Sequence, residues 1–200
     1  MARILIATSN AGKLRDFAGA ATAHGIEVEG IPNFASLPQV VEDGETFEAN
    51  ARKKAEAYSR YVPGELVLAD DSGLEVDALG GAPGVHSARY AATGGENASD
   101  DQNNARLLCE LRSVPAAKRT ARFVCVIAAA RDGKVLEAFR GEAEGLILDE
   151  PRGAGGFGYD PLFFSPEARK TFAELSTEEK ARYSHRGRAF RVFLQSRSSK

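Results

Sequence analysis

The amino-acid sequence predicts an α/β fold built on a mixed β-sheet. Strand and helix patterns alternate along most of the chain, and this order is typical of a sheet with helices packed on its faces. A strong hairpin signal, Asp132-Gly133, interrupts the alternation, and a hairpin joins antiparallel strands. We therefore expect parallel and antiparallel strand pairs in one sheet.

The first half of the chain contains four strand patterns and two helix patterns. Apolar and β-branched runs predict buried strands, and apolar residues at helical spacing predict helices. Gly25 and the pair Pro63-Gly64 end the two helices. The expected elements are strands at 3–7, 26–31, 66–69 and 74–79, helices at 14–21 and 47–61, and a turn at 72–73.

The second half contains the hairpin and three further helix signals. Ser99 with Gln102, and Ser176 with Glu179, fit capping boxes, in which two side chains satisfy the first free amides of a helix. The expected elements are a helix at 99–112, strands at 119–130 and 134–140, a glycine-dense loop at 151–161 and a closing helix at 188–195.

Length and composition predict one domain over residues 1–200. The chain has 26 Lys and Arg against 28 Asp and Glu, a net charge of -2, and 43% apolar residues. These values argue against a disordered chain and against an electrostatic surface for duplex nucleic acid, so we expect no stable nucleic-acid binding. The longest apolar run, 123–130, is far shorter than the ~20 residues of a membrane helix.

The two cysteines and the N-terminus indicate the compartment. Cys109 and Cys125 are too few for a disulfide framework, so we expect two buried free thiols in a reducing environment. The short apolar run at 4–6 does not fit a signal peptide. The sequence therefore predicts a cytoplasmic protein.

The first candidate site is the segment that joins the first strand to the first helix. Small and polar residues at a helix start present backbone N–H groups that bind phosphate. Lys13 adds a positive charge in the first turn, where it opposes the helix dipole. The same pattern also fits a capped helix with a solvated lysine. The candidate residues are Thr8, Ser9, Asn10, Ala11, Gly12 and Lys13.

The second candidate site contains adjacent carboxylates, Asp70 and Asp71, at the end of an apolar strand. Strand neighbours point to opposite faces, so a metal shared by both needs the turn expected after them. Carboxylates near a phosphate-binding loop suit a Mg²⁺–nucleotide site, and Glu42 in the preceding acidic loop offers a further oxygen ligand. A capping turn at 70–73, with a solvated acidic surface around Glu42, is the alternative.

Two more candidates lie near the C-terminus. Phe157 and Tyr159 stand between glycines in a loop and suit stacking on a planar base, with Gly158 allowing close approach and Asp160 accepting hydrogen bonds. The alternative is a structural turn with both aromatic rings tucked beneath it. Lys180, His185 and Arg186 supply donors for carbonyl oxygens or phosphate. A solvated helix junction is the alternative for these three residues.

Taken together, five stretches of the chain carry a resemblance to a known family. The sequence resembles the inosine triphosphate pyrophosphatase-like family, in particular its bacterial XTP/dITP diphosphatases. Matching stretches occur in order over nearly the whole chain, at 7–13, 69–74, 80–90, 155–161 and 184–187.

The resemblance implies a long curved mixed sheet with flanking helices, two lobes and an active-site cleft between them, in a homodimer. It implies Mg²⁺-dependent hydrolysis of ITP, dITP and XTP to the monophosphate and pyrophosphate, which keeps deaminated purines out of DNA and RNA. By the same resemblance Asp71 is the general base and a metal ligand, Glu42 the second metal ligand and Ser72 a substrate contact. Residues 8–13 hold the triphosphate, residues 157–160 grip the nucleoside, and Lys180, His185 and Arg186 meet the phosphate or the base.

One position departs from the family pattern, which carries a glutamate directly before Asn50. Here that position is Ala49, and Glu48 lies one residue away, about 100° around a helix. Two other functions remain open: a pyrophosphatase for modified pyrimidine nucleotides, and a nucleotide-binding protein without catalysis.

Overall fold

Seven strands form one mixed sheet in the order β2-β1-β3-β4-β5-β6-β7. The computed structural model describes residues 3–22, 24–93 and 96–198. β1 pairs in parallel with β2 and β3, whereas every pair from β3 to β7 is antiparallel. The predicted α/β fold with a mixed sheet is therefore confirmed.

The strands are β1 (Arg3–Ile6), β2 (Glu27–Gly30), β3 (Val67–Val76), β4 (Thr120–Arg131), β5 (Lys134–Ile147), β6 (Phe163–Ser165) and β7 (Lys170–Thr171). The α-helices are α1 (Ala11–Thr22), α2 (Phe47–Ser59), α3 (Asp100–Glu110), α4 (Thr177–Tyr183) and α5 (His185–Ser198). The short 3₁₀ helix η3 (Gly84–Arg89) follows β3.

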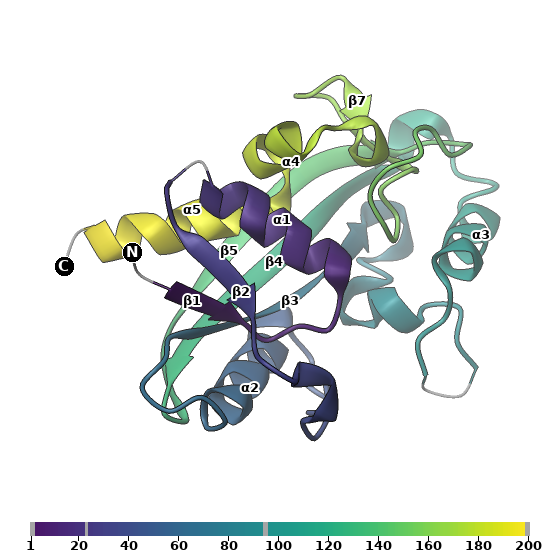
Figure 1. Ribbon diagram of the computed structural model, residues 1–200. Helices are drawn as coiled ribbons and strands as arrows, with labels where there is room; N and C mark the ends of the chain where they lie inside the picture. Colours follow the sequence, from purple (N-terminus) through teal and green to yellow (C-terminus); the bar gives the residue numbers. More distant parts are fainter. Residues whose placement is uncertain (1–2, 23, 94–95, 199–200) are drawn as a thin grey trace.

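The hairpin of β4 and β5 is the longest part of the sheet and curves through the whole molecule (Figure 1). Its turn residues, Asp132 and Gly133, have positive φ angles of 51° and 75°. Two successive positive φ angles make the turn whose twist matches paired strands. The predicted hairpin is confirmed, and β5 continues seven residues beyond the strand expected at 134–140, to Ile147.

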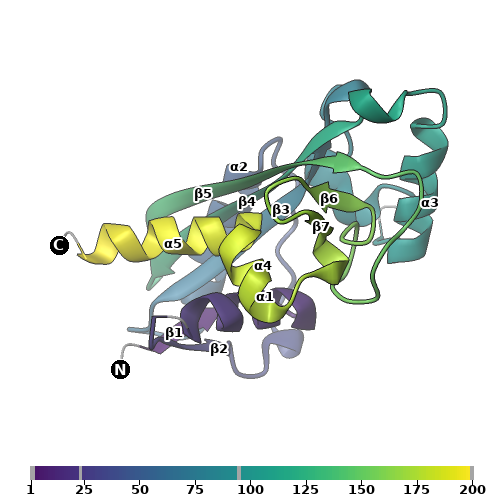
Figure 2. The ribbon, with the colours of Figure 1, turned by 90° about the horizontal axis from the view of Figure 1, so that it is seen from above.

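Helices cover both faces of the parallel end of the sheet (Figures 1 and 2). On one face Phe17 of α1 and Phe190 of α5 pack with Ile6 and Ile127. On the other face the Ala-rich side of α2 packs with alternate residues of the same strands. The distal halves of β3, β4 and β5 join α3 in a third core cluster with the rings of Phe163 and Phe172.

One local prediction is wrong in a way that matters for the site. Ser72 and Gly73 form no turn, because β3 runs without a break from Val67 to Val76 and pairs residue by residue with β4. Gly73 serves a close crossing instead: a Cβ there would lie 2.4 Å from Ser87 Oγ and 2.5 Å from the Gly84 carbonyl oxygen. η3 therefore crosses directly over the strand.

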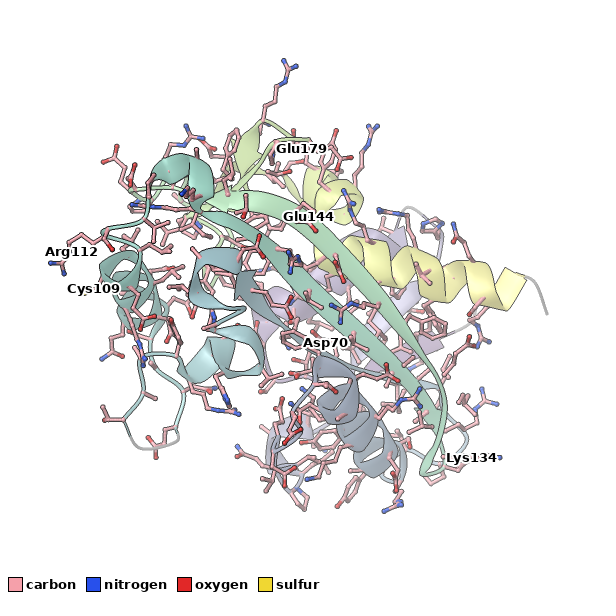
Figure 3. The ribbon with its side chains drawn as sticks, turned by 180° about the vertical axis from the view of Figure 1, so that it is seen from behind. Asp70, Cys109, Arg112, Lys134, Glu144 and Glu179 are labelled. Carbon is pink, nitrogen blue, oxygen red and sulfur yellow. The ribbon has the colours of Figure 1, made fainter. Side chains whose placement is uncertain are left out.

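The structure differs from the sequence-based expectations at three further places. Cys125 is buried as expected, but Cys109 is exposed on the outer side of α3 (Figure 3), because the buried face of that helix carries Asn103 and Leu107. The short strands β6 and β7 were not expected from the sequence. α5 begins at His185, three residues before the predicted start.

The described residues form five α-helices, of which the longest is α5 with 14 residues. None of them is both long enough and apolar enough to cross a bilayer.

Candidate active site

The two adjacent carboxylates of β3 lie on opposite faces of the sheet. Asp70 pairs with Ile127 and Asp71 with Val126 in the ladder to β4, so their side chains alternate. Asp70 faces α1 and α5, whose Lys13 and Arg186 approach it, and Asp71 faces α2 through Lys54. Figure 3 places Asp70 within the central part of the sheet. Because no turn redirects them, one ion cannot be held between both side chains as the sequence suggested.

Asp70 is fully buried among positive charges. Lys13 Nζ lies 3.0 Å from Asp70 Oδ2, and Arg186 Nε lies 3.5 Å from the same oxygen. Burial alone raises the pKa of a carboxyl group, but Lys13, Arg186 and Lys54 outweigh it and hold the pKa of Asp70 well below its usual range. Asp70 is therefore a permanent negative charge that binds cations of the protein itself.

The cations on this face form a connected network with Asp16 of α1. The guanidinium of Arg186 donates to Asp16 Oδ2 at 2.7 Å and to Ser72 Oγ at 2.8 Å. Lys180 Nζ lies 2.6 Å from Asp160 Oδ2 and 3.7 Å from Asp16 Oδ1. Asp16 thus connects the helix that follows the first candidate segment to the cations of α4 and α5.

Asp71 belongs to a different cluster on the α2 face. Lys54 Nζ lies 3.2 Å from Asp71 Oδ1 and 2.7 Å from Glu42 Oε2, and Asn50 Nδ2 donates to Asp71 Oδ2 at 3.1 Å. Burial raises the pKa of Asp71 to about 6, and the nearby Glu42 carboxylate adds to this rise while Lys54 opposes it. Burial also acts on Glu42, but Lys54 outweighs it and lowers the pKa of Glu42.

Local sequence explains how α2 delivers these groups. Thr46 caps the helix by accepting from the Ala49 amide at 3.1 Å. Asn50 and Lys54 stand one helical turn apart, so both project from the same buried face. The Asn50 side chain also accepts from the Gly44 amide at 2.8 Å, which fixes the acidic loop that carries Glu42.

The first candidate segment forms the start of α1 as predicted. Asn10 Oδ1 accepts from the Lys13 amide at 3.0 Å, and Thr8 Oγ1 accepts from the Asn10 amide at 3.1 Å. Gly12 lies under the ring of Phe157, where a Cβ would come within 2.5 Å of Cδ1. This helix start therefore contacts the glycine-dense loop that is distant in the sequence.

The glycine-dense loop separates its two aromatic residues. Phe157 is partly exposed, and its ring centre lies 5.3 Å from Lys180 Nζ and 5.4 Å from Arg186 Cζ. Tyr159 is buried in the third core cluster and donates to the Ser87 carbonyl at 2.8 Å. Asp160 accepts from the Phe157 amide at 2.9 Å, and burial raises the pKa of Asp160 although Lys180 opposes this.

His185 is buried between the network and the core. Its ring stacks on Phe123 at 4.7 Å and lies parallel to Phe172 at 6.2 Å. Burial, with the charges of Arg186 and Lys180, lowers the pKa of His185 well below its usual range, so the imidazole is neutral near pH 7. Within the described chain Nδ1 of His185 has no hydrogen-bond partner.

The structure groups the predicted residues around β3 in two sets. Lys13, Ser72, Phe157, Asp160, Lys180 and Arg186 are linked on one face, and Glu42 and Asp71 lie together on the other. Sequence reasoning did not assign Asp16, Asn50 or Lys54 to the site. The sequence did contain a signal for two of them: Asn50 and Lys54 stand at i and i+4 on the apolar face of an Ala-rich helix, where polar side chains are unusual.

Glu48 does not replace the family glutamate at the Ala49 position. It is exposed and forms an ion pair with Arg52 at 2.7 Å on the surface of α2. Ala49 is exposed as well, and its Cβ lies 2.9 Å from the point where a Cβ on Gly44 would stand. The acidic groups beside Asp71 therefore come from the loop, through Glu42.

The donor set on the Asp71 face fits a divalent cation that also binds a substrate. No three or more His, Cys, Asp or Glu side chains within residues 3–22, 24–93 and 96–198 are arranged to hold a metal ion alone. Mg²⁺ commonly takes only one or two carboxylates and completes its shell with water and phosphate oxygens. Glu42 and Asp71 supply two carboxylates that already share one cation, the Lys54 ammonium.

Comparisons with known proteins identify the family of this chain. A sequence profile described as the Ham1 family matches residues 4–196. The dITP/XTP pyrophosphatase of Geobacter sulfurreducens is 53% identical over 189 residues, which cover 94% of this chain and 93% of that protein. The dITP/XTP pyrophosphatase of Geobacillus kaustophilus is 52% identical, over 94% of this chain and 91% of its own.

Solved structures show the same fold. The Ham1 protein of Staphylococcus aureus superimposes with a TM-score of 0.79 at 42% identity, covering 98% of this chain and 99% of its own. A HAM1 protein of Coxiella burnetii gives a TM-score of 0.82 at 37% identity and covers all of both chains. The chain belongs to the Ham1 family.

Proposed function

We propose that this protein hydrolyses deaminated purine nucleoside triphosphates, namely ITP, dITP and XTP, to the monophosphate and pyrophosphate. The names of its relatives support this substrate class. The observation that carries the proposal is the division of β3: Asp71 has a carboxylate neighbour and a pKa raised to about 6, while Asp70 is held among lysine and arginine. The face of β3 that carries Asp71 offers metal ligands and a base, and the face that carries Asp70 offers positive charges.

The phosphates are assigned to the start of α1. Asn10 Oδ1 caps the Lys13 amide, so the amides of Ala11 and Gly12 are the ones that the helix itself leaves without a partner, and Lys13 follows them directly. In the proposed complex the segment 8–13 binds the triphosphate, and Lys13 exchanges part of its contact with Asp70 for phosphate oxygens. These donors stabilise the charge that develops on the leaving pyrophosphate.

Asp71 and Glu42 are the proposed ligands of a divalent cation, for which we propose Mg²⁺. The chemistry that a bound Mg²⁺ supplies at such a site is neutralisation of phosphate charge and positioning of water. Asp71 accepts the proton of the attacking water, since it is the carboxylate that lies beside Glu42 and is held in place by Lys54 and Asn50. Lys54 and Asn50 orient both carboxylates through the contacts described above.

The nucleoside is assigned to the glycine-dense loop. Phe157, the partly exposed ring, stacks on the base, while the buried Tyr159 fixes the loop from below. Ser72, Gly158, Asp160 and Lys180 border the same region. His185 and Arg186 are assigned to the 6-oxo edge, because hypoxanthine and xanthine present an acceptor there and adenine presents a donor.

Four further features complete the proposal. The protein acts in the cytoplasm, and it acts as a homodimer. The chain forms one two-lobed domain with the nucleotide between the lobes. It binds neither duplex nucleic acid nor a membrane.

A panel of nucleoside triphosphates, assayed with Mg²⁺ for pyrophosphate, tests the proposal. We expect release from ITP, dITP and XTP well above that from ATP, GTP or modified pyrimidine nucleotides. Preference for a modified pyrimidine substrate, release of orthophosphate, or tight ITP binding without turnover would each contradict it.

A further inference from the structure

Helix α3 lies outside both groups of site residues but contacts the loop that carries Phe157. α3 packs in the third core cluster through Leu107 and its C-cap residue Leu111, at the end of the sheet away from α2 (Figure 1). Its N-terminus is fixed by the capping box of Ser99 and Gln102. It therefore offers a rigid support next to the glycine-dense loop.

Two side chains of α3 bind both polar groups of one residue in that loop. Asp100 Oδ2 accepts from the Gly158 amide at 2.6 Å, and Asn104 Nδ2 donates to the Gly158 carbonyl at 3.0 Å. Asp100 and Asn104 are one helical turn apart, so they act from the same helix face. Asp100 thus supplies the acceptor for the amide of Gly158, and Asn104 supplies the donor for its carbonyl group.

Gly158 needs such support for its conformation. Its φ angle is +62°, and nothing packs against the position that a Cβ would occupy. A glycine in this region can adopt many backbone conformations, and no side-chain packing restricts it. Three hydrogen bonds therefore restrain the peptide groups that join Phe157 to Tyr159: the two from α3 to Gly158, and the one that the Phe157 carbonyl accepts from the Asp160 amide at 3.2 Å.

One peptide bond joins Gly158 to Phe157, so the hydrogen bonds that hold Gly158 also limit the position of Phe157. Phe157 contacts Gly12 and lies beside Lys180 and Arg186, so a displacement of Gly158 moves the ring relative to the nucleotide site. Asp160 and Tyr159 fix the loop on the other side, through the Phe157 amide and the Ser87 carbonyl. Of the residues named here, only Phe157 touches the segment 8–13, where its ring packs on Gly12.

We propose that Asp100 and Asn104 are positioning residues that hold the Gly158 peptide, and thereby set the place of Phe157 for a purine base. This inference rests on the proposed function, in which Phe157 stacks on the nucleoside. The effect is confined to recognition of the base, because neither residue contacts the carboxylates of β3 or the start of α1.

The test compares Asp100→Ala with Asp101→Ala. Both variants remove one negative charge from the first turn of α3, but only Asp100 accepts from Gly158. We expect Asp100→Ala to raise KM for ITP roughly tenfold, with kcat nearly unchanged, since it loses binding that substrate and transition state share. Asp100→Asn keeps an acceptor and restores most of the loss, and Asp101→Ala leaves KM unchanged.

Asn104→Ala and inorganic tripolyphosphate complete the design. Asn104→Ala gives a rise of a few-fold in KM for ITP, because a neutral hydrogen bond contributes less than a charged one. Tripolyphosphate has no base, so its inhibition constant stays the same in every variant. This control separates misplacement of the loop from general loss of structure.

Equal KM values for Asp100→Ala and Asp101→Ala would overturn the inference, as would a parallel loss of tripolyphosphate inhibition. The dissociation constant of ITP, measured without Mg²⁺, gives the same comparison independently of turnover. A wild-type protein that binds ITP but releases no pyrophosphate would thus contradict the proposed function, while the ratio of dissociation constants still tests the role of α3.

Discussion

The two faces of β3 carry the same residue type at adjacent positions in opposite electrostatic environments. Asp70 lies between Lys13 and Arg186, and its pKa is well below the usual range. Asp71 shares Lys54 with Glu42, and its pKa is raised to about 6. Since strand alternation sends the side chains to different helices, the helices determine which carboxylate can bind a proton or an external cation.

The difference teaches that the Asp-Asp pair is not one metal site. Asp70 has its charge neutralised by the protein, whereas Asp71 and Glu42 bring two carboxylates to one lysine. The first arrangement organises cations for phosphate, and the second is suited to a base and a divalent ion. Variants on either face test this division.

The largest effect on stability is expected for Asp70→Asn. Removing this charge leaves Lys13 and Arg186 without their shared buried partner, and breaking a buried ion pair from one side costs about 3–5 kcal/mol. Asp71→Asn costs less than about 1 kcal/mol, because Lys54 keeps Glu42 at 2.7 Å. Urea unfolding at pH 7 measures both, and equal losses would refute the division of the two faces.

Glu42→Gln should weaken metal binding without unfolding the protein. We expect the Mg²⁺ concentration for half-maximal activity to rise roughly tenfold or more, because one of two carboxylates is lost. Glu48→Gln is the matched control, since Glu48 pairs with Arg52 on the surface. A Mg²⁺ titration that shifts equally in both variants would show that Glu42 is not a ligand.

The buried imidazole of His185 provides a pH-dependent test of its surroundings on the Asp70 face. Burial, Arg186 and Lys180 lower its pKa in the folded protein, whereas the unfolded chain titrates near 6.5. Below pH 6.5 the unfolded state therefore binds more protons, and the contribution of His185 to stability falls as pH falls. At higher pH that contribution is fully present.

The comparison with His185→Phe isolates this effect from the other titrating groups. Between pH 6.5 and 5 the wild type should lose stability relative to the variant by up to about 1.4 kcal/mol per pH unit. The free energy of unfolding is measured for both proteins in urea at several pH values. A constant difference across this range would mean that the pKa of His185 is not lowered.

Glu48→Gln itself gives the smallest expected change. The Glu48–Arg52 pair is an exposed i,i+4 pair, so its loss costs about 0.3–0.5 kcal/mol in the free energy of unfolding. Pyrophosphate release should stay at the wild-type rate. A large loss of activity would bring the α2 surface into the site, contrary to the two-face description.

Features determined by a few neighbouring residues could be predicted from the sequence. Asp132 and Gly133 adopt the turn that their residue types favour, and Ser99 and Ser176 cap their helices as expected. The motif order was sufficient to identify the family. These features need no information about distant segments.

Features determined by distant partners could not be predicted in the same way. Continuity of β3 through Asp71 depends on pairing with β4, some 50 residues later. Arg186 pairs with Asp16, and Asp71 pairs with Lys54, only because of which helix packs on which face of the sheet. Cys109 was misjudged because the helix pattern did not reveal which side of α3 is buried.

The central claim is that Asp71, not Asp70, performs the base chemistry of the site. The most direct test is the rate of pyrophosphate release from XTP by Asp71→Asn with saturating Mg²⁺. Loss of a general base costs about 10²- to 10⁴-fold in rate, and we expect a decrease of that size in a protein whose free energy of unfolding stays within about 1 kcal/mol of the wild-type value. A rate within a few-fold of wild type would contradict the claim.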